Sequence, residues 1–243
     1  MNEKVVLEVE NLNVFMKDEH SKKRVQILKN ISFSVKSGEI LGLVGESGTG
    51  KTTLSKAILG FVKDTTGSIL YNTKNPQMIF QDPFSSLNPA KRVGWILEEP
   101  LKNQRLLSKE ARKEKVCDMA QKVGLEETIL NRYPRQLSGG QRQRVSIGCA
   151  LIAGADFIIA DEPVSALDVT VQKQILELME DLCDTLSLSY LFISHDLNVI
   201  YQICDRVLVM KDGQIVEEGN VEDIFTSPRT EYTKQLLEAS LEY

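Results

Sequence analysis

Alternation between hydrophobic and polar positions marks both ends of the chain. It runs through residues 5–15 and 27–35, which predicts two antiparallel strands joined by the polar turn 17–24. The same alternation returns at 206–210 and 214–218, on either side of an Asp-Gly pair that favours a tight turn. The sequence therefore predicts antiparallel pairing near the start and a β-hairpin near the end.

Short, continuously apolar runs lie between these two regions. Runs at 40–44, 157–160 and 190–193 are typical of strands that are buried on both faces, as in a parallel sheet. Two shorter strands are expected at 67–71 and 77–80, joined by a polar loop.

Helical spacing of apolar residues separates most of these strands. The helices predicted in this way cover 53–61, 108–123, 142–152, 169–186, 221–225 and 231–241. Residues 82–101 are expected to form a loop, because three prolines punctuate them. Trp95, Ile96 and Leu97 in this loop are either a partner-docking patch or buried core, and core is the more frequent explanation.

The overall composition narrows the class of protein. A chain of 243 residues with 42% hydrophobic content can bury a sizeable core, and alternating strands and helices predict an α/β fold. The formal charge of -5 gives no sign of a general nucleic-acid surface, so nucleic acid is not an expected partner. Four scattered cysteines without neighbouring histidines suggest neither a zinc site nor a disulfide framework. No apolar run approaches the length of a membrane span, so the chain itself is not expected to enter a membrane.

A glycine-rich turn after the apolar run 40–44 carries the strongest chemical signal. It consists of Gly45, Glu46, Ser47, Gly48, Thr49, Gly50, Lys51, Thr52 and Thr53. A strand, such a turn and a helix together predict a P-loop, whose backbone N–H groups surround a polyphosphate. Lys51 would reach the β- and γ-phosphates, and the Thr52 hydroxyl would bind Mg²⁺. A glycine-rich turn with a chance Lys-Thr is the alternative.

Two carboxylates, Asp161 and Glu162, follow the apolar run 157–160 directly. Acids at the end of a buried strand are costly unless they are paired or bind a metal. Strand alternation would point them in different directions, so that Asp161 helps to hold Mg²⁺ and Glu162 polarises a water as general base. The alternative is that the two acids lie at an exposed strand end and have no function.

Three further side chains are candidates by their position. Gln81 and His195 each follow a predicted strand, where an α/β sheet presents polar groups to a ligand. Gln81 would touch Mg²⁺ or the attacking water, and His195 would contact the γ-phosphate and orient Glu162. The alternative for Gln81 is a solvated cap at the strand end. The alternative for His195 is a core histidine whose hydrogen bonds are satisfied within the protein. Phe15 is a candidate platform for an adenine ring, and an ordinary core or edge aromatic is an equal alternative.

A second anion-binding turn is predicted at the start of the helix 142–152. It consists of Ser138, Gly139, Gly140 and Gln141. Its serine hydroxyl and glycine N–H groups are available to a phosphate, although the same sequence occurs in ordinary loops.

In this order, the motifs resemble the nucleotide-binding subunit of ATP-binding cassette (ABC) transporters over nearly the whole chain. Segments 80–89, 133–144 and 161–168 and the tail 225–237 are similar to the branch that imports peptides and nickel. The resemblance implies a P-loop NTPase (RecA-like) core with a mostly parallel sheet and an antiparallel β subdomain. This core would comprise residues 1–81 and 151–243, and residues 82–150 would form an inserted helical subdomain that ends in the signature turn.

The resemblance also implies ATP hydrolysis with Mg²⁺ by two cassettes that face each other head to tail. Ser138 to Gln141 of one cassette would cap the ATP that Lys51 of the other cassette holds. Thr53 would support the α-phosphate, Asp168 would connect the two sites, and Gln81 would link the Mg²⁺ site to a membrane subunit.

The implied partners are a second ABC ATPase subunit, two membrane permeases and an extracellular substrate-binding protein. The chain would lie at the cytoplasmic face of the cell membrane, as a peripheral subunit. The resemblance to this branch favours a different chain as the second cassette, and a second copy of the same chain is the alternative. Peptides and nickel or other metal chelates both stay open as cargo.

Two other classes of function use some of the same motifs. Cassette ATPases that remodel DNA or ribosomes would carry long coiled-coil inserts or a tandem second cassette, and neither is seen. A P-loop module that only binds nucleotide would lack the Glu162 and His195 pair.

Three features depart from the family pattern. Gly148-Cys149 replaces an expected Ala-Arg, which affects local packing or interface charge. The segment 72–76 is short. No cysteine-rich extension follows the tail, and this slightly favours metal chelates as the cargo.

Overall fold

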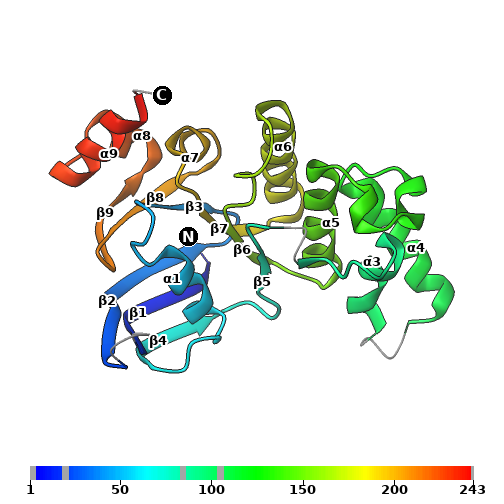
Figure 1. Ribbon diagram of the computed structural model, residues 1–243, viewed down its shortest axis with the longest axis horizontal. Helices are drawn as coiled ribbons and strands as arrows, with labels where there is room; N and C mark the ends of the chain where they lie inside the picture. The colour runs from blue at the N-terminus through cyan, green and yellow to red at the C-terminus, as the bar shows by residue number, and fades with distance from the viewer. Residues whose placement is uncertain (1–3, 18–21, 83–85, 103–106, 242–243) are drawn as a thin grey trace.

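Two β-sheets and a set of helices make up the computed structural model of the protein (Figure 1). It describes residues 4–17, 22–82, 86–102 and 107–241. The predicted turn 17–24 and the segment 80–89 therefore lie in part outside the described residues.

The smaller sheet is antiparallel and has the order β2-β1-β4. Its central strand β1 (Val5–Lys17) pairs with β2 (Arg24–Lys36) on one side and with β4 (Thr65–Tyr71) on the other. The predicted antiparallel pairing near the start of the chain is confirmed, and the short strand expected at 67–71 joins this sheet.

The larger sheet has six strands in the order β5-β6-β7-β3-β8-β9. Its strands are β3 (Ile40–Val44), β5 (Gln77–Ile79), β6 (Phe157–Asp161), β7 (Ser189–Ile193), β8 (Arg206–Lys211) and β9 (Gln214–Asn220). All neighbours pair in parallel except β8 and β9, which form the predicted hairpin. Asp212 and Gly213 have φ values of 47° and 78°, as a tight hairpin turn with two left-handed residues requires.

Each central strand of the larger sheet is buried on both faces. Leu41 and Leu43 of β3 belong to the core shared with the antiparallel sheet, whereas Ile40 and Val44 belong to the core shared with the helices on the other face. Because side chains alternate along a strand, burial on two faces makes every position apolar. The continuous apolar runs of the sequence are explained in this way.

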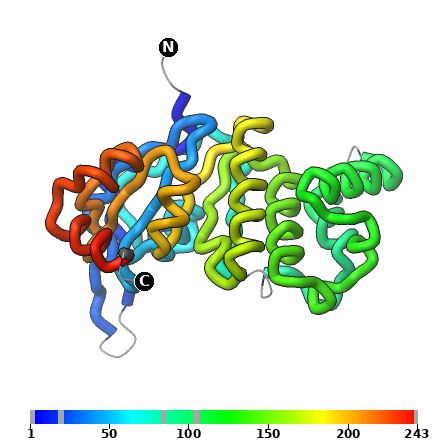
Figure 2. Tube along the Cα trace, turned by 90° about the horizontal axis from the view of Figure 1, so that it is seen from above, coloured from blue at the N-terminus to red at the C-terminus, as the bar shows by residue number. Residues whose placement is uncertain are grey.

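Helices cover the sheets and extend the molecule at both ends (Figure 1). They are α1 (Lys51–Ile58), α3 (Val93–Lys102), α4 (Lys109–Lys122), α5 (Gly139–Ile152), α6 (Val169–Leu186), α7 (Leu197–Ile203), α8 (Val221–Thr226) and α9 (Glu231–Leu241), with short 3-10 helices at Glu127–Asn131 and Pro134–Gln136. Helices α3 and α4 lie at one end, and α8 and α9 lie at the other. Figure 2 shows α5 and α6 side by side between these ends. Within the described ranges, none of the helices combines the length and the apolar character needed to cross a bilayer.

The expectation of a loop at 82–101 is wrong for its second half, which forms α3. Pro100 lies inside this helix and lacks the N–H that a helical hydrogen bond needs. Val93, Leu97 and Leu101 recur at helical spacing and are buried, and this burial outweighs the missing bond. Ile96 and Leu97 are core residues, so burial rather than docking explains them. The short helix α7 was not predicted.

Candidate functional site

The P-loop, Gln81, Glu162 and His195 lie at one edge of the larger sheet, where its parallel strands end. The P-loop follows β3, His195 follows β7, Glu162 follows β6, and Gln81 follows β5. Strands β5, β6, β7 and β3 are neighbours in this order, so four stretches that are far apart in the sequence end side by side. Such an edge is where α/β sheets bind ligands.

Glycine is required at two positions of the P-loop for different reasons. Gly45 has a φ of 153°, and a Cβ there would lie 2.2 Å from the carbonyl oxygen of Met210 in β8. Gly48 has a φ of 85°, and a Cβ there would meet nothing within 4 Å. The loop is therefore packed tightly against the sheet at its start and opens to free space at its middle, where a phosphate would enter.

Lys51 lies inside this loop. Its Nζ donates to the carbonyl oxygens of Gly45 at 2.6 Å and Glu46 at 2.9 Å. Burial lowers the pKa of Lys51, and the nearby carboxylates Glu162 and Asp161 oppose that shift. Helix α1 begins here without a side-chain cap, which leaves its first backbone N–H groups for an anion.

Asp161 and Thr52 form a pair of oxygen donors beside Lys51. The Asp161 carboxyl is buried and accepts a hydrogen bond from the Thr52 side chain. Burial raises the pKa of Asp161, and the hydrogen bond from Thr52 opposes that shift. A hydroxyl and a carboxylate are hard oxygen ligands of the kind that Mg²⁺ binds together with phosphate oxygens. The residues present therefore fit a magnesium ion.

Glu162 does not lie in the strand, so alternation is the wrong reason for its direction. Strand β6 ends at Asp161, and Glu162 has a left-handed φ of 50°. Its N–H donates to the carbonyl oxygen of Ile193 at 2.9 Å, which fixes the strained residue at the sheet. A left-handed residue other than glycine costs free energy and often marks a functional site.

Two neighbours hold the Glu162 carboxylate. Gln81 Nε2 donates to its Oε2 at 2.8 Å, and His195 Nδ1 lies 3.1 Å from its Oε1. The Glu162 side chain is 17% exposed and that of His195 is 59% exposed. The carboxylate therefore lies at the boundary between the buried Lys51 region and solvent, where a water could be oriented.

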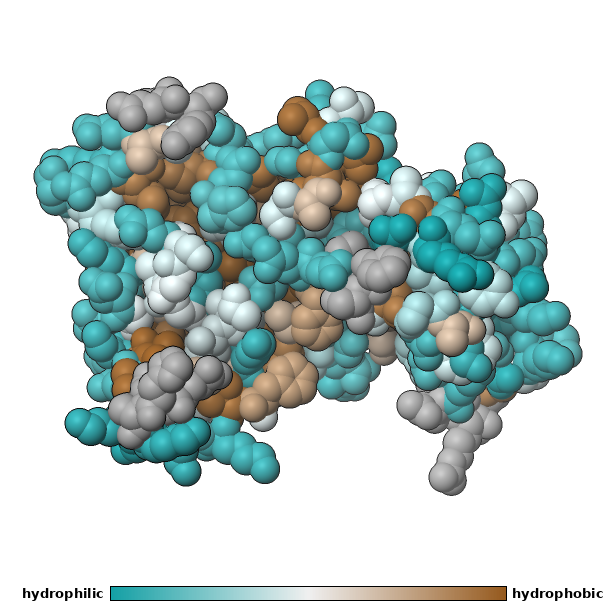
Figure 3. Space-filling view, in the orientation of Figure 1, coloured by the Kyte–Doolittle hydropathy of each residue, from teal (hydrophilic) through white to brown (hydrophobic). Residues whose placement is uncertain are grey.

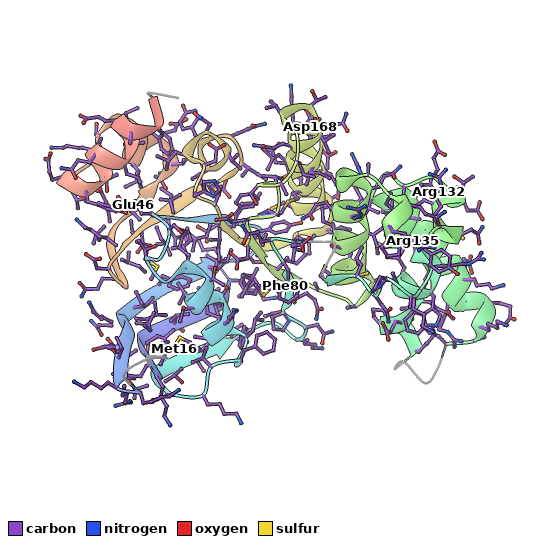
Figure 4. All side chains as sticks on the ribbon, in the orientation of Figure 1. Met16, Glu46, Phe80, Arg132, Arg135 and Asp168 are labelled. Carbon is purple, nitrogen blue, oxygen red and sulfur yellow. The ribbon has the colours of Figure 1, made fainter. Side chains whose placement is uncertain are left out.

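The second glycine turn does not meet the P-loop within this chain. Ser138 Oγ accepts from the N–H of Gln141 at 3.3 Å, and Gln141 Oε1 accepts from the N–H of Ser138 at 3.0 Å. Gly139 packs closely on Leu167, and Gly140 packs closely on Val171. These two contacts lie on either side of Asp168 in the sequence. Asp168 caps α6 by accepting from the N–H of Val171 at 3.0 Å. Figure 4 shows Asp168 well separated from Glu46 of the P-loop.

Phe15 lies in β1 with its ring half-buried. The guanidinium of Arg24 lies 3.7 Å from the ring centroid. One face of the ring is therefore in contact with a cation of the neighbouring strand.

An apolar surface area surrounds Phe80, next to Gln81 (Figures 3 and 4). Phe80 is 44% exposed and Phe61 is 66% exposed. A groove of about 250 Å³ runs from Phe80 toward α3 and α5, and Glu99 and Cys149 line its far side. Burial raises the pKa of Cys149 to about 12, so its thiol is protonated at neutral pH.

Tyr232 of α9 also contacts the P-loop, and the motifs did not predict it. The N–H of Glu46 donates to Tyr232 Oη at 3.2 Å. The resemblance singled out the tail that contains Tyr232, but no sequence pattern linked it to a loop 186 residues earlier.

Comparison with known proteins gives a family and several relatives. Residues 28–165 match the family described as ABC transporter. The dipeptide transport ATP-binding protein DppF of Haemophilus influenzae is 46% identical in an alignment 232 positions long, which covers 89% of this chain and 71% of that protein. The oligopeptide transport ATP-binding protein OppF of Streptococcus pyogenes is 44% identical in an alignment 256 positions long, which covers 98% of this chain and 82% of that protein.

Solved structures agree with these relatives. The structure of cbiO1 from Clostridium perfringens has a TM-score of 0.82 at 28% identity and covers 93% of this chain and 92% of that chain. A dimeric structure of the ATP-binding cassette MJ0796 bound to ADP and Pi has a TM-score of 0.78 at 27% identity. The match covers 89% of this chain and 99% of that chain. The predicted α/β architecture is confirmed. The family match and the relatives show that the chain belongs to the ABC transporter family.

Proposed function

We propose that the chain is the ATP-hydrolysing subunit of an importer that carries peptides. The observation that carries this proposal is the Glu162 carboxylate, held between Gln81 and His195 at the strand ends beside the P-loop. A carboxylate in this place can accept a proton from a water that attacks the γ-phosphate.

The P-loop residues bind and orient the nucleotide. Backbone N–H groups of the P-loop surround the phosphates, except that of Glu46, which donates to Tyr232. Lys51 neutralises the phosphate charge from inside the loop. Thr52, Asp161 and Gln81 would hold Mg²⁺, which would supply charge stabilisation to the β- and γ-phosphates. His195 orients Glu162 and the γ-phosphate.

Hydrolysis requires a second cassette. Ser138 to Gln141 and Asp168 lie away from the P-loop of their own chain, which supports a role in a partner's site. In a head-to-tail pair, the turn 138–141 of each cassette caps the nucleotide of the other. The resemblance favours a different chain as the second cassette.

Two membrane permeases and an extracellular binding protein complete the system, and the chain lies at the cytoplasmic face.

The groove of about 250 Å³ between Phe80 and α3 is the docking site for a permease segment. It begins one residue from Gln81, so docking there can reach Glu162 through the hydrogen bond from Gln81.

The relatives favour peptides as cargo. They are named for dipeptide and oligopeptide transport, whereas none of those reported above is named for nickel. The same names favour transport over the action on ribosomes or DNA that other cassette ATPases perform.

Substitution of Glu162 by Gln tests the catalytic part of the proposal. We expect Glu162→Gln to lower ATP turnover at least about 100-fold, as loss of a general base does, and to keep ATP binding. Phosphate release and calorimetric binding of Mg-ATP measure the two quantities. Glu177→Gln is a matched control, because this carboxylate on α6 is exposed and pairs with the exposed Lys173. Turnover near the wild-type rate in Glu162→Gln would contradict the assignment.

Uptake in cells whose only copy of this chain is the variant or the wild type tests the cargo. A labelled dipeptide should enter with the wild type and with Glu177→Gln, and should stay outside with Glu162→Gln. Nickel uptake that follows the same pattern, with no dipeptide uptake, would assign the chain to metal chelates instead.

A further inference from the structure

The first peptide group of the P-loop is held from both sides. This group consists of the carbonyl of Gly45 and the N–H of Glu46. The carbonyl accepts from Lys51 Nζ at 2.6 Å, and the N–H donates to Tyr232 Oη at 3.2 Å. Because a trans peptide directs its C=O and N–H to opposite sides, the two contacts together fix its rotation.

Tyr232 is itself held firmly. Its side chain is buried, and the ammonium of Lys211 in β8 lies 4.6 Å from its ring centroid. The start of α9 is fixed by Glu217 of β9, which accepts from the N–H of Arg229 at 2.7 Å and from that of Thr230 at 3.0 Å. The hydroxyl that reaches the P-loop is therefore carried by a rigid support.

We infer that Tyr232 is a positioning residue for the nucleotide phosphates and acts through the Gly45–Glu46 peptide and Lys51. When the hydroxyl is removed, this peptide can rotate, and the carbonyl that holds the Lys51 ammonium leaves its place. The ammonium then binds the β- and γ-phosphates more weakly. The inference rests on the proposed role of Lys51 in phosphate binding and adds the C-terminal helix to the nucleotide site.

The substitution Tyr232→Phe tests this inference, because it removes the hydroxyl and keeps the ring and its contact with Lys211. We expect the Kd for Mg-ATP and Mg-ADP and the KM for Mg-ATP to rise about fivefold, the size of one hydrogen bond. We expect kcat to stay within about twofold. Calorimetry with the full chain gives the Kd values, and steady-state hydrolysis gives the split between KM and kcat.

Two further variants make the result decisive. Tyr201→Phe is the matched control, because Tyr201 is 52% exposed, its ring contacts that of Phe225 at a tilt of 50°, and its hydroxyl makes no hydrogen bond to other described residues. It should bind nucleotide like the wild type. Lys51→Ala should lose nucleotide affinity, and this variant tests the proposed phosphate site separately.

Each outcome decides one of the two ideas. Unchanged Kd and KM in Tyr232→Phe, with loss of binding in Lys51→Ala, would overturn the role of Tyr232 and leave the phosphate site in place. A lower melting temperature and a lower kcat at unchanged KM would show that Tyr232 is only structural and would also overturn it. Wild-type binding by Lys51→Ala would overturn the proposed site itself.

Discussion

Asp161 shows a conflict between stability and function at a single residue. Its carboxyl is buried, and this burial raises its pKa above the ordinary value. A raised folded-state pKa means that the folded protein prefers the protonated acid. The resulting penalty is absent below the ordinary pKa, grows as the pH rises toward the folded-state pKa, and is complete above it.

We therefore expect Asp161→Asn to stabilise the nucleotide-free protein at pH 7. The expected gain is about 1 kcal/mol, or a rise of roughly 2–4 °C in Tm for a chain of this size. With Mg-ATP the order should reverse, because the variant loses a magnesium ligand and gains less stability from the ligand. Thermal unfolding with and without Mg-ATP measures both effects.

The control for this prediction is Asp118→Asn, which changes an exposed carboxylate on α4. It should leave the Tm unchanged in both conditions. A lower Tm of Asp161→Asn without nucleotide would mean that the hydrogen bond from Thr52 and the charge of Lys51 outweigh the cost of burying Asp161.

At the scale of elements, Gly148 sets the distance between three helices. A Cβ at this position of α5 would lie 3.1 Å from Leu97 Cδ2 of α3 and 3.6 Å from atoms of Met119 and Val123 at α4. The departure from the expected Ala-Arg thus falls where α3, α4 and α5 meet. Glycine allows the closest approach, and Cys149 beside it faces the proposed docking groove.

Substitutions at Gly148 should therefore depend steeply on size. We expect Gly148→Ala to change the free energy of unfolding by less than about 1 kcal/mol, because better helix propensity offsets the tight contact with Leu97. Gly148→Leu should destabilise by about 2–3 kcal/mol, because the helices must move apart. Denaturant unfolding measures both, with Glu114→Leu on the exposed face of α4 as control. Equal stability of Gly148→Leu and wild type would contradict close packing here.

At the scale of the whole molecule, Arg206 of the larger sheet forms a buried ion pair and a hydrogen bond to the smaller sheet. Arg206 of β8 donates to Glu39 Oε1 at 2.7 Å and to the carbonyl oxygen of Ser34 in β2 at 2.7 Å. The side chains of Arg206 and Glu39 are only 13% and 8% exposed. Burial raises the pKa of Glu39, and Arg206 opposes this shift. Loss of Arg206 would therefore leave a buried carboxylate without its cation.

We expect Arg206→Leu to destabilise the protein by about 3 kcal/mol at pH 7. The pKa of Glu39 should rise further in this variant, so the deficit should shrink as the pH falls and Glu39 takes up a proton. Denaturant unfolding at neutral and mildly acidic pH measures this trend. Lys173→Leu, at an exposed pair on α6, should cost less than about 0.5 kcal/mol at either pH. A deficit of Arg206→Leu that grows on acidification would contradict the role of Glu39.

Much of the fold and the site could be predicted because the signals are local. Apolar runs identified β3, β6 and β7, and an Asp-Gly pair identified the β8–β9 hairpin. The P-loop is encoded in consecutive residues, since a glycine turn, a lysine and a helix start need only their own neighbours. Polar residues at strand ends marked Gln81 and His195 as candidates and predicted that His195 would orient Glu162, because α/β sheets present polar groups to a ligand there. The hydrogen bond from Gln81 to Glu162 was not predicted.

The sequence by itself determined the strands, the P-loop and the family. Only the tertiary structure decided the helix α3, the left-handed backbone of Glu162 and the contact of Tyr232 with Glu46. In α3, burial of Leu97 and its neighbours overrides the proline signal. Glu162 takes its direction from a hydrogen bond to β7, and Tyr232 reaches a loop 186 residues away. These features depend on packing between distant segments, which no local pattern encodes.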